Sequence, residues 1–378
     1  VLLCTACGGR QPAPLPSAAD KPVVIEPATH AGIFPVREEE AKRLCGLLSA
    51  GRQKLASWND MAFAVEQSLA YVRCQPQEQV LFHAWDRPVS YGDMAEALTR
   101  FKALLPRLDA EPELLASAFT WYRVGPDFGF TGYYEPELAA SPVRTNRFRH
   151  PLYAKPPELS RKNRRKAFHT RHAIDRKGAL AGRGLEIAWT DDPVEVFILH
   201  IQGSGRLRYA DGRVRHALYA GQNGRKYVSL GRIMRERGHL PADGISMDSI
   251  RDWLARHPAE RDALLDTNPS YVFFRLSDEP SQGSMGRPLT PWVSVATDQK
   301  ALPNGCLAFM SVDLPAEQGK SVSFHALTLP QDKGGAIRGH RVDLFCGHGP
   351  EAERVAGNLN ARGAVFVLLP RYVLPSGA

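Results

Sequence analysis

Residues 341–349 read Arg-Val-Asp-Leu-Phe-Cys-Gly-His-Gly, a short strand pattern that runs into a glycine-rich turn. Because side chains alternate across a strand, the apolar residues at positions 342 and 344 face one side, while Arg341, Asp343 and Phe345 face the other. An acid beside an aromatic ring is a candidate general acid, since partial desolvation raises the pKa of a carboxyl group. The alternative is an ion pair between Asp343 and Arg341 on an exposed face, and the local pattern leaves both interpretations open.

Further short strands surround this stretch in the C-terminal part of the chain. A helix from Pro350 to Arg362 interrupts them, with Pro at the first helical position and Gly363 just past the end. Many short strands with glycine-rich turns favour a barrel or sandwich over a doubly wound sheet. The strand candidates are residues 271–275, 292–297, 306–312, 323–329, 341–346 and 364–369.

Helical patterns dominate the chain before Gly125 and return after Val228. Between these groups Gly and Pro punctuate the sequence, and we expect strands at 128–134 and 194–202. The predicted fold class is therefore mixed α+β, mainly β around the candidate acid. The expected helices span residues 38–57, 59–74, a segment opened by a capping box at 90–93, 111–123, 228–237, 247–256 and 260–266.

Composition describes a basic globular protein. Its 378 residues, 43% of them hydrophobic, suffice for about two to three domain-sized units. The formal net charge of +8 favours a polyanionic partner, such as nucleic acid, an anionic membrane face or an acidic polysaccharide. No apolar run is long enough to span a bilayer as a helix.

Signatures of several other functional classes are missing. Gly203-Ser204-Gly205 lacks the spacing of a nucleophile elbow and the third glycine of a dinucleotide fingerprint, and no phosphate-binding loop is present. The basic cluster at 161–166 could grip phosphates or form a solvated loop, and no nucleic-acid-binding fold signature accompanies it.

Metal binding is also disfavoured. His169 and His172 lie three positions apart in an expected loop, and no CxxC pair occurs, so we expect neither a zinc site nor a metalloenzyme. A disulfide between Cys45 and Cys74 remains open.

The N-terminal segment resembles a bacterial lipoprotein processing site. Ala6 precedes Cys7, and a Pro/Ala-rich stretch follows, so Cys7 is a better candidate for lipidation than Cys4, which follows a bulky Leu. The alternative is a frayed terminus with incidental cysteines. Residues 8–37 lack periodicity and are interpreted as a tether.

Four segments, in this order along the chain, together resemble one family. They are residues 130–136 (Phe-Thr-Gly-Tyr-Tyr-Glu-Pro), 200–207 (His-Ile-Gln-Gly-Ser-Gly-Arg-Leu), 268–274 (Asn-Pro-Ser-Tyr-Val-Phe-Phe) and 331–349. The family is that of membrane-bound lytic murein transglycosylase A (MltA), and the resemblance covers about residues 120–370.

This resemblance implies a double-psi β-barrel with a C-terminal three-aspartate (3D) module and an inserted second β-barrel domain, with a groove between the domains. Residues 1–37 are assigned to a lipoprotein signal remnant and tether. Residues 38–136 and 267–374 are assigned to the catalytic barrel with flanking helices, the module lying at about 290–349. Residues 137–266 are assigned to the inserted substrate-binding domain with its helices.

The resemblance also assigns roles to individual residues. Asp343 matches the single catalytic acid/base of the family. Asp298 and Asp332 fall where the other aspartates of the module are expected, although an Asp at such turns commonly accepts backbone N–H bonds. The implied substrate contacts are Tyr134, Glu135, Gln202, Gly203, Ser204, Asp332 and Phe345, with Asp298 and Arg341 in support.

The implied reaction cleaves the β-1,4 bond between N-acetylmuramic acid and N-acetylglucosamine and leaves a 1,6-anhydromuramoyl end, with no metal or cofactor. The implied partners are peptidoglycan strands, the periplasmic face of the bacterial outer membrane through a lipid on Cys7, and cell-wall synthesis proteins. Two alternatives stay open: a non-catalytic peptidoglycan-binding scaffold lipoprotein, and a nucleic-acid-binding protein that uses the cluster at 161–172. Nucleic acid is not the expected partner.

Overall fold

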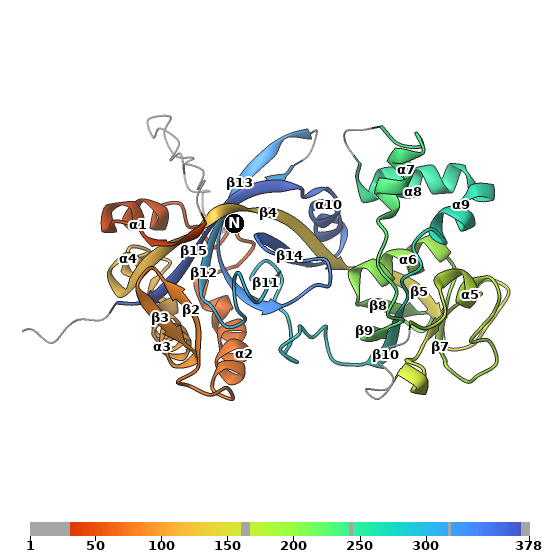
Figure 1. Cartoon of the computed structure of the whole chain (residues 1–378), viewed down its shortest axis with the longest axis horizontal. Coiled ribbons are helices and arrows are strands. Elements are labelled where there is room, and N and C mark those ends of the chain that lie inside the picture. The colour runs from red at the N-terminus through yellow and green to blue at the C-terminus, as the bar shows by residue number, and fades with distance from the viewer. Residues whose placement is uncertain (1–30, 160–166, 242–244, 317–318, 372–378) are drawn as a thin grey trace, which may run out of the picture.

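The computed structural model describes residues 31–159, 167–241, 245–316 and 319–371, and two large sheets organise them (Figure 1). The first sheet has seven strands in the order β1-β4-β14-β11-β13-β12-β15, and β15 also pairs with β4, which closes the sheet into a barrel. These strands are β1 (Gly32–Pro35), β4 (Phe119–Glu135), β11 (Ser294–Thr297), β12 (Ala308–Pro315), β13 (Ser321–Asp332), β14 (Arg341–His348) and β15 (Ala361–Pro370).

The barrel is the expected double-psi β-barrel. Strand β14 runs parallel to β4, and β11 runs parallel to β13, while the other neighbours are antiparallel. Parallel neighbours need long crossover connections, and the connection between β4 and β14 includes the whole second sheet. Packed rings of Trp121, Phe309 and Phe366, with centroids 5.3–6.3 Å apart, fill part of the interior.

Helices cover the end of the barrel that lies away from the second sheet (Figure 1). The capping box expected at Ser90 is present, because Ser90 Oγ accepts from the Asp93 N–H at 3.2 Å and Asp93 accepts from the Ser90 N–H at 2.8 Å. These elements are α1 (Glu38–Cys45), α2 (Ala62–Val72), the hairpin β2 (Val80–Ala84) and β3 (Arg87–Ser90), α3 (Tyr91–Leu104) and α4 (Leu114–Ala118).

The inserted domain carries a six-stranded sheet in the order β10-β9-β8-β5-β7-β6. A bridge between Ala154, just after β6, and Phe274 in β10 brings its two ends together, so this sheet is also barrel-like. Strand β10 completes the sheet beyond the boundary expected at residue 266. Its strands are β5 (Glu137–Ser141), β6 (His150–Tyr153), β7 (Glu186–Thr190), β8 (Gly205–Tyr209), β9 (Val214–Gln222) and β10 (Val272–Ser277), with helices α5 (Arg171–Asp175), α6 (Pro193–Gln202), α7 (Leu230–Glu236), α8 (Met247–Arg256) and α9 (Pro258–Leu265).

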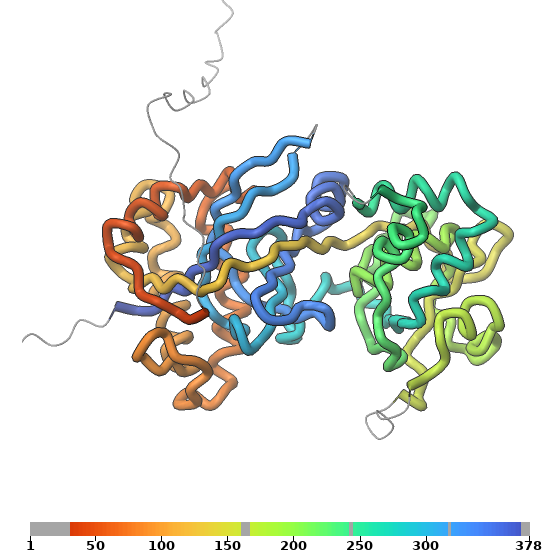
Figure 2. Tube along the Cα trace, turned by 45° about the horizontal axis from the view of Figure 1, so that its top comes forward, coloured from red at the N-terminus to blue at the C-terminus, as the bar shows by residue number. Residues whose placement is uncertain are grey.

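Strand β4 joins the two domains. It is 17 residues long and runs from the closed barrel to the edge of the inserted domain (Figures 1 and 2). Helix α10 (Pro350–Asn358) packs on β4 and β14 and is the barrel helix beside the inserted domain in both views.

The strand predicted at 194–202 is wrong, because these residues form helix α6. Asp192 caps the helix by accepting from the Val194 N–H at 2.7 Å, and Pro193 occupies its first turn. A short apolar run that is buried on several sides has no distinguishing period, so alternation could not separate helix from strand here.

Other boundaries also differ from expectation. The helix predicted at 111–123 ends at Ala118, because Phe119 and the residues after it pair with β15. The helix predicted at 38–57 ends at Cys45, and α10 ends at Asn358, since Ala361 already belongs to β15. Cys45 and Cys74 are both free thiols, so the possible disulfide between them is absent.

Among the described residues, no helix has the length and the apolar character that crossing a bilayer requires. The tether expected at 8–37 is wrong at its end, because residues 32–35 form strand β1 and pair with β4. Its residues 8–30 lie outside the described residues, as do Cys7 and the basic cluster at 161–166.

The contact between α10 and β4 depends on a glycine. A Cβ at Gly132 would lie 2.8 Å from the Ala356 Cα, which is backbone and cannot move aside alone. We expect Gly132→Ala to lower the free energy of unfolding by about 1–3 kcal/mol through overpacking. Chemical denaturation measures this change.

The matched control is Gly129→Ala in the same strand, where an added Cβ meets no atom within 4 Å. It should change stability by at most about 0.5 kcal/mol. Equal effects of the two substitutions would contradict this account of the packing.

Candidate active site

A row of facing residues crosses four neighbouring strands of the barrel. Asp343 in β14 lies opposite Thr131 in β4 and opposite Ala296 in β11, and Ala296 in turn lies opposite Asp332 in β13. Residues in register on neighbouring strands point to the same face of a sheet. The sheet therefore places both predicted aspartates on one face, separated by a small alanine.

Asp343 is the desolvated acid of this row. Burial raises the pKa of its carboxyl group to about 6, although a hydrogen bond from the Thr131 hydroxyl at 2.7 Å and the nearby Arg341 charge act in the opposite direction. Arg341 donates to the Thr131 hydroxyl at 3.3 Å. Thr131 therefore stands between the acid and the cation, and the exposed ion pair considered from the sequence is not what holds Asp343.

Both carboxylate oxygens of Asp332 accept hydrogen bonds. One oxygen accepts from the Ser284 and Lys333 N–H groups at 2.7 and 2.8 Å, and the other accepts from the Tyr133 hydroxyl at 3.1 Å. Burial raises the pKa of this carboxyl group, and the hydrogen bonds partly oppose that rise. The ring of Tyr133 lies 5.2 Å from that of Phe345, so Asp332 orients an aromatic pair beside Asp343.

Asp298 ties a turn together, as expected for an Asp that accepts backbone N–H bonds. Its oxygens accept from the Gly339 N–H at 2.7 Å and the Lys300 N–H at 3.1 Å. These backbone hydrogen bonds lower the pKa of Asp298, which is therefore a charged structural group at the base of the loop before β14.

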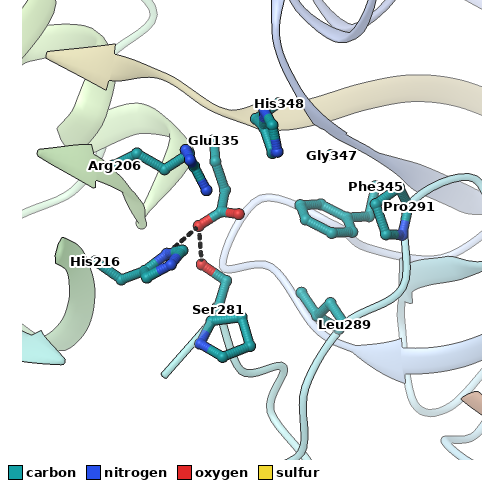
Figure 3. A pocket seen from close by; sticks show the side chains of 10 residues that line it. Glu135, Arg206, His216, Ser281, Leu289, Pro291, Phe345, Gly347 and His348 are labelled. Carbon is teal, nitrogen blue, oxygen red and sulfur yellow. Dashed lines mark hydrogen bonds and ion pairs between the residues drawn. The ribbon is translucent and has the colours of Figure 1, made fainter. Parts of the chain in front are cut away.

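A pocket of about 200 Å³ lies between the domains (Figure 3). The barrel contributes Phe345 and His348, and the inserted sheet contributes Arg206 and His216. Phe345 lies two residues after Asp343 on the same face of β14. The wall of the pocket therefore begins two positions along the strand from the acid. The remaining lining residues are Glu135, Pro280, Ser281, Leu289, Pro291 and Gly347.

Glu135 anchors the pocket at the point where β4 leaves the barrel. Its Oε1 accepts from the Ser281 hydroxyl at 2.5 Å and lies 3.2 Å from His216 Nδ1, as the dashed lines of Figure 3 mark. Only 5% of Glu135 is exposed, so the carboxylate is held by groups from the inserted sheet and from the returning chain. His216 and Ser281 carry no local sequence signal, so their place in the site could not be predicted from the sequence.

The predicted residues Gln202, Gly203 and Ser204 lie at the end of α6, beside the pocket rather than in its wall. Gln202 Oε1 accepts from the Tyr134 N–H at 3.1 Å, so two of the sequence motifs meet here. Gly203 ends the helix in the left-handed conformation, with φ of 84°, which favours glycine. The motif therefore fixes the end of α6 against the β4–β5 bend.

Tyr134 points away from the pocket. Because neighbouring residues of a strand face opposite sides, its side chain leaves β4 on the face opposite Glu135, and it is only 3% exposed. Its hydroxyl donates to Glu353 at 3.1 Å and accepts from Arg251 at 2.9 Å. The side chain expected at the saccharide is thus enclosed in a polar cluster between the domains.

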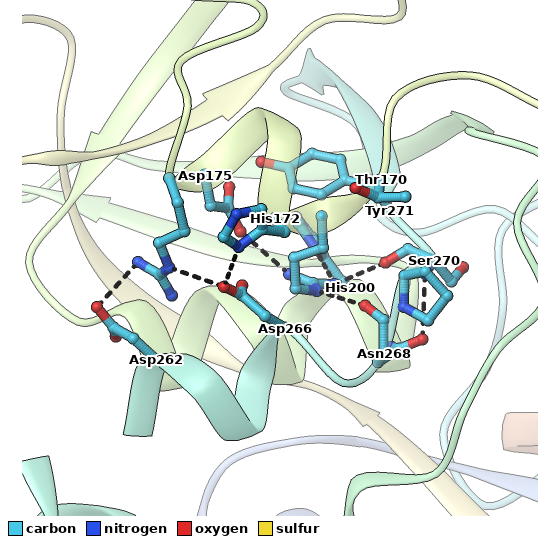
Figure 4. A network of polar contacts seen from close by, with 12 residues as sticks. Thr170, His172, Asp175, His200, Asp262, Asp266, Asn268, Ser270 and Tyr271 are labelled. Carbon is cyan, nitrogen blue, oxygen red and sulfur yellow. Dashed lines mark hydrogen bonds and ion pairs between the residues drawn. The ribbon is translucent and has the colours of Figure 1, made fainter. Parts of the chain in front are cut away.

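The motif at 268–274 supports the inserted domain through a buried network (Figure 4). Arg171 is 2% exposed and donates to the carbonyls of Asn268 and Ser270 at 3.2 and 3.0 Å. It also lies 2.9 Å from His200 Nδ1, and burial beside this guanidinium keeps the pKa of His200 well below its usual range. His200 therefore accepts from Arg171 as a neutral ring, which ties α6 to the chain before β10.

Metal binding finds no support in the described ranges, where no group of three or more His, Cys, Asp or Glu side chains is arranged to hold an ion.

A partly desolvated acid beside a Tyr–Phe ring pair, near a pocket between a double-psi barrel and a second sheet, is typical of an enzyme that uses acid/base catalysis. Comparison with protein families agrees. Residues 129–275 match the MltA specific insert domain, and residues 293–369 match the 3D domain.

Similar proteins carry one name. The chain is 34% identical over 309 residues to membrane-bound lytic murein transglycosylase A of Escherichia coli K12, covering 74% of this chain and 82% of that protein. It is 36% identical over 244 residues to the Vibrio cholerae protein of the same name, covering 63% of this chain and 64% of the other.

Solved structures give the same result. The membrane-bound lytic murein transglycosylase of Agrobacterium tumefaciens superposes with a TM-score of 0.72 at 29% identity, covering 90% of this chain and 98% of that one. E. coli MltA with bound chitohexaose gives 0.68 at 29% identity, covering 82% and 90%. The chain belongs to the membrane-bound lytic murein transglycosylase A family and is an enzyme of that class.

The burial of Asp343 makes a prediction about stability. Because its pKa is about 6 in the folded protein and near 4 in an unfolded chain, ionisation costs stability as the pH rises from about 4 to about 6. Asp343→Asn keeps an acceptor for Thr131 and should raise the free energy of unfolding at pH 7.5 by roughly 2–3 kcal/mol. The gain should vanish below about pH 4, where Asp343 is neutral in both states.

Denaturant unfolding across this pH range measures the effect. Asp298→Asn is the control with the opposite sign, because the lowered pKa of Asp298 makes its charged form stabilising at neutral pH. A loss of stability in the Asp343 variant at pH 7.5 would refute the assignment of Asp343 as a desolvated acid.

Proposed function

We propose that this chain is a peptidoglycan lytic transglycosylase in which Asp343 is the only acid/base. It cleaves the β-1,4 bond between N-acetylmuramic acid and N-acetylglucosamine without adding water. The observation that carries the proposal is the partly buried Asp343 carboxyl group, whose desolvation raises its pKa to about 6, on the strand that leads into the interdomain pocket.

The first step is protonation of the leaving oxygen. Asp343 in its acid form donates its proton to the glycosidic oxygen, and the C1–O bond of the muramoyl residue breaks as positive charge develops at C1. Since burial raises the pKa of Asp343, a useful fraction stays protonated at the pH of the cell envelope.

The second step uses the same carboxylate as a base. It takes the proton from the muramoyl C6 hydroxyl, whose oxygen closes onto C1 and forms the 1,6-anhydro ring. Asp343 is thereby protonated again, so the cycle consumes no water, metal or cofactor. The Arg341 charge, acting across Thr131, stabilises the carboxylate between the two steps.

The hydrogen bonds of the other carboxylates near the pocket support a mechanism with a single acid. A hydrolase needs a second carboxylate to activate water or to attack the sugar. Asp332 accepts from Ser284, Lys333 and Tyr133, and Glu135 accepts from Ser281 and lies against His216. Both serve better as positioning groups than as a second base.

Substrate contacts follow from the lining of the pocket. Phe345 and Glu135 are proposed as contacts because both line the pocket, although only 2% of Phe345 and 5% of Glu135 are exposed, so each presents few atoms to a sugar. Asp332 acts through Tyr133, whose ring meets Phe345, and Gln202, Gly203 and Ser204 shape the rim beside the β4–β5 bend. Tyr134 contributes from behind this wall, and the chitohexaose complex of E. coli MltA supports glycan binding by the fold.

The proposed location is the periplasmic face of the outer membrane, with a lipid on Cys7 and the residues between Cys7 and strand β1 as the tether. The relatives are named membrane-bound, and the described helices offer no membrane span. Cell-wall synthesis proteins are the proposed further partners.

The reaction is tested by mass spectrometry of soluble muropeptides released from purified sacculi. Wild-type protein should release 1,6-anhydromuramoyl products, and Asp343→Asn should reduce their rate by at least about 10³-fold, because proton transfer fails in both steps. Reducing-end products would instead indicate a hydrolase. Binding to sacculi without release would indicate a scaffold.

Membrane attachment is tested separately. With a lipoprotein signal peptide in front, the Cys7→Ser variant should move from the membrane fraction to the soluble periplasmic fraction, whereas Cys4→Ser should stay with the membrane. Both variants should keep their activity on sacculi in detergent extracts, since neither cysteine lies in the described site. Lipidation at Cys4 would reverse the two results.

A further inference from the structure

Arg251 is the centre of a polar cluster that the reaction does not use. From helix α8 it forms a bidentate ion pair with Glu195 in α6, at 2.7 and 3.1 Å, and donates to the Tyr134 hydroxyl at 2.9 Å. It also pairs with Glu353 in α10, which accepts from Tyr134 as well. Asp248, one turn away on α8, lies 3.6 Å from the guanidinium.

The two glutamates belong to different domains. Glu195 and Arg251 both lie in helices of the inserted domain, so their pair is internal to it. Glu353 lies in the first turn of α10, which packs on the barrel strands β4 and β14. The Arg251–Glu353 pair therefore joins the domains, and α8 lies beside α10 at this point (Figure 2).

The cluster lies across β4 from the pocket. Tyr134 faces the cluster, and its neighbour Glu135 faces the pocket, because successive side chains leave a strand on opposite sides. The chain itself connects the domains through the β4–β5 bend and through residues 278–293, both of which border the pocket. A link on the far face of β4 thus opposes rotation of the inserted domain about this strand.

The cluster is sheltered enough to act as a link. The side chain of Arg251 is 20% exposed and that of Glu353 is 37% exposed, so water screens the pair only in part. Tyr134 is 3% exposed and bonds to both partners, which fixes their geometry.

We infer that the Arg251–Glu353 pair, with Tyr134, is an interdomain clamp that sets the width of the glycan groove and makes Arg251 a positioning residue for glycan binding. This inference rests on the proposed function for the identity of the ligand. A glycan that touches both walls binds best when they are already held at the right separation, since no binding energy is then spent on ordering them.

The chain offers a matched pair of variants. Glu353→Ala removes the partner across the domain boundary, and Glu195→Ala removes the partner within the inserted domain. Each residue lies in the first turn of its helix and pairs with the same guanidinium, so the loss of favourable helix-dipole charge is comparable in both.

We expect Glu353→Ala to weaken binding of chitohexaose about five-fold, measured by calorimetry, because glycan binding must then also fix the domain angle. On soluble murein strands its KM should rise by a similar factor with kcat nearly unchanged, since Thr131, Arg341 and Asp343 all lie within the barrel. Glu195→Ala should leave both quantities within about two-fold of wild type while lowering thermal stability.

Equal changes in the two variants, or a fall in kcat with unchanged KM, would show that the cluster only stabilises the fold and would overturn the inference. Small-angle scattering adds a readout that does not need substrate, because only the Glu353 variant should broaden the interdomain distance distribution. If wild-type protein released no anhydro products but the chitohexaose results held, the proposed reaction would fail and the clamp would stand.

Discussion

The pairing of β4 with both β14 and β15 is the constraint on which the rest of this structure depends. With β15 it closes the barrel, and with β14 it brings Thr131 opposite Asp343. The same strand ends with Tyr134 and Glu135 on opposite faces, at the junction with the second domain. A one-residue slip in its register would turn every one of these side chains to the wrong side.

The chemistry of the site follows from the different surroundings of three aspartates. Asp298 keeps its charge because backbone N–H groups surround it, whereas Asp343 receives one hydroxyl and is otherwise desolvated. Asp332 lies between these cases, since it is partly buried but well supplied with donors. Three aspartates of one module thus have distinct surroundings, and Asp343 combines a raised pKa with a single hydroxyl donor on its carboxyl group.

Local patterns in the sequence predicted the parts of the site that depend on neighbouring residues. Alternation in 341–345 placed Asp343 and Phe345 on one face, and the tendency of Asp at turns to accept backbone N–H bonds indicated how Asp298 would be held. Local patterns could not reveal residues whose roles come from contacts between distant segments. These residues are His216, Ser281, Arg251 and Glu353. The strand predicted at 194–202 was wrong because α6 is buried on several sides. Its apolar run therefore lacks the period that distinguishes a helix from a strand.

The path of the chain has a consequence for how such proteins diversify. The inserted domain leaves the barrel after Glu135 and returns before Trp292, and both crossings border the same pocket. The acid, its hydroxyl partner and its cation all belong to the barrel, while the facing wall belongs to the insert. Substitutions in the inserted domain can therefore change the wall that contacts the polymer without changing the surroundings of the proton donor.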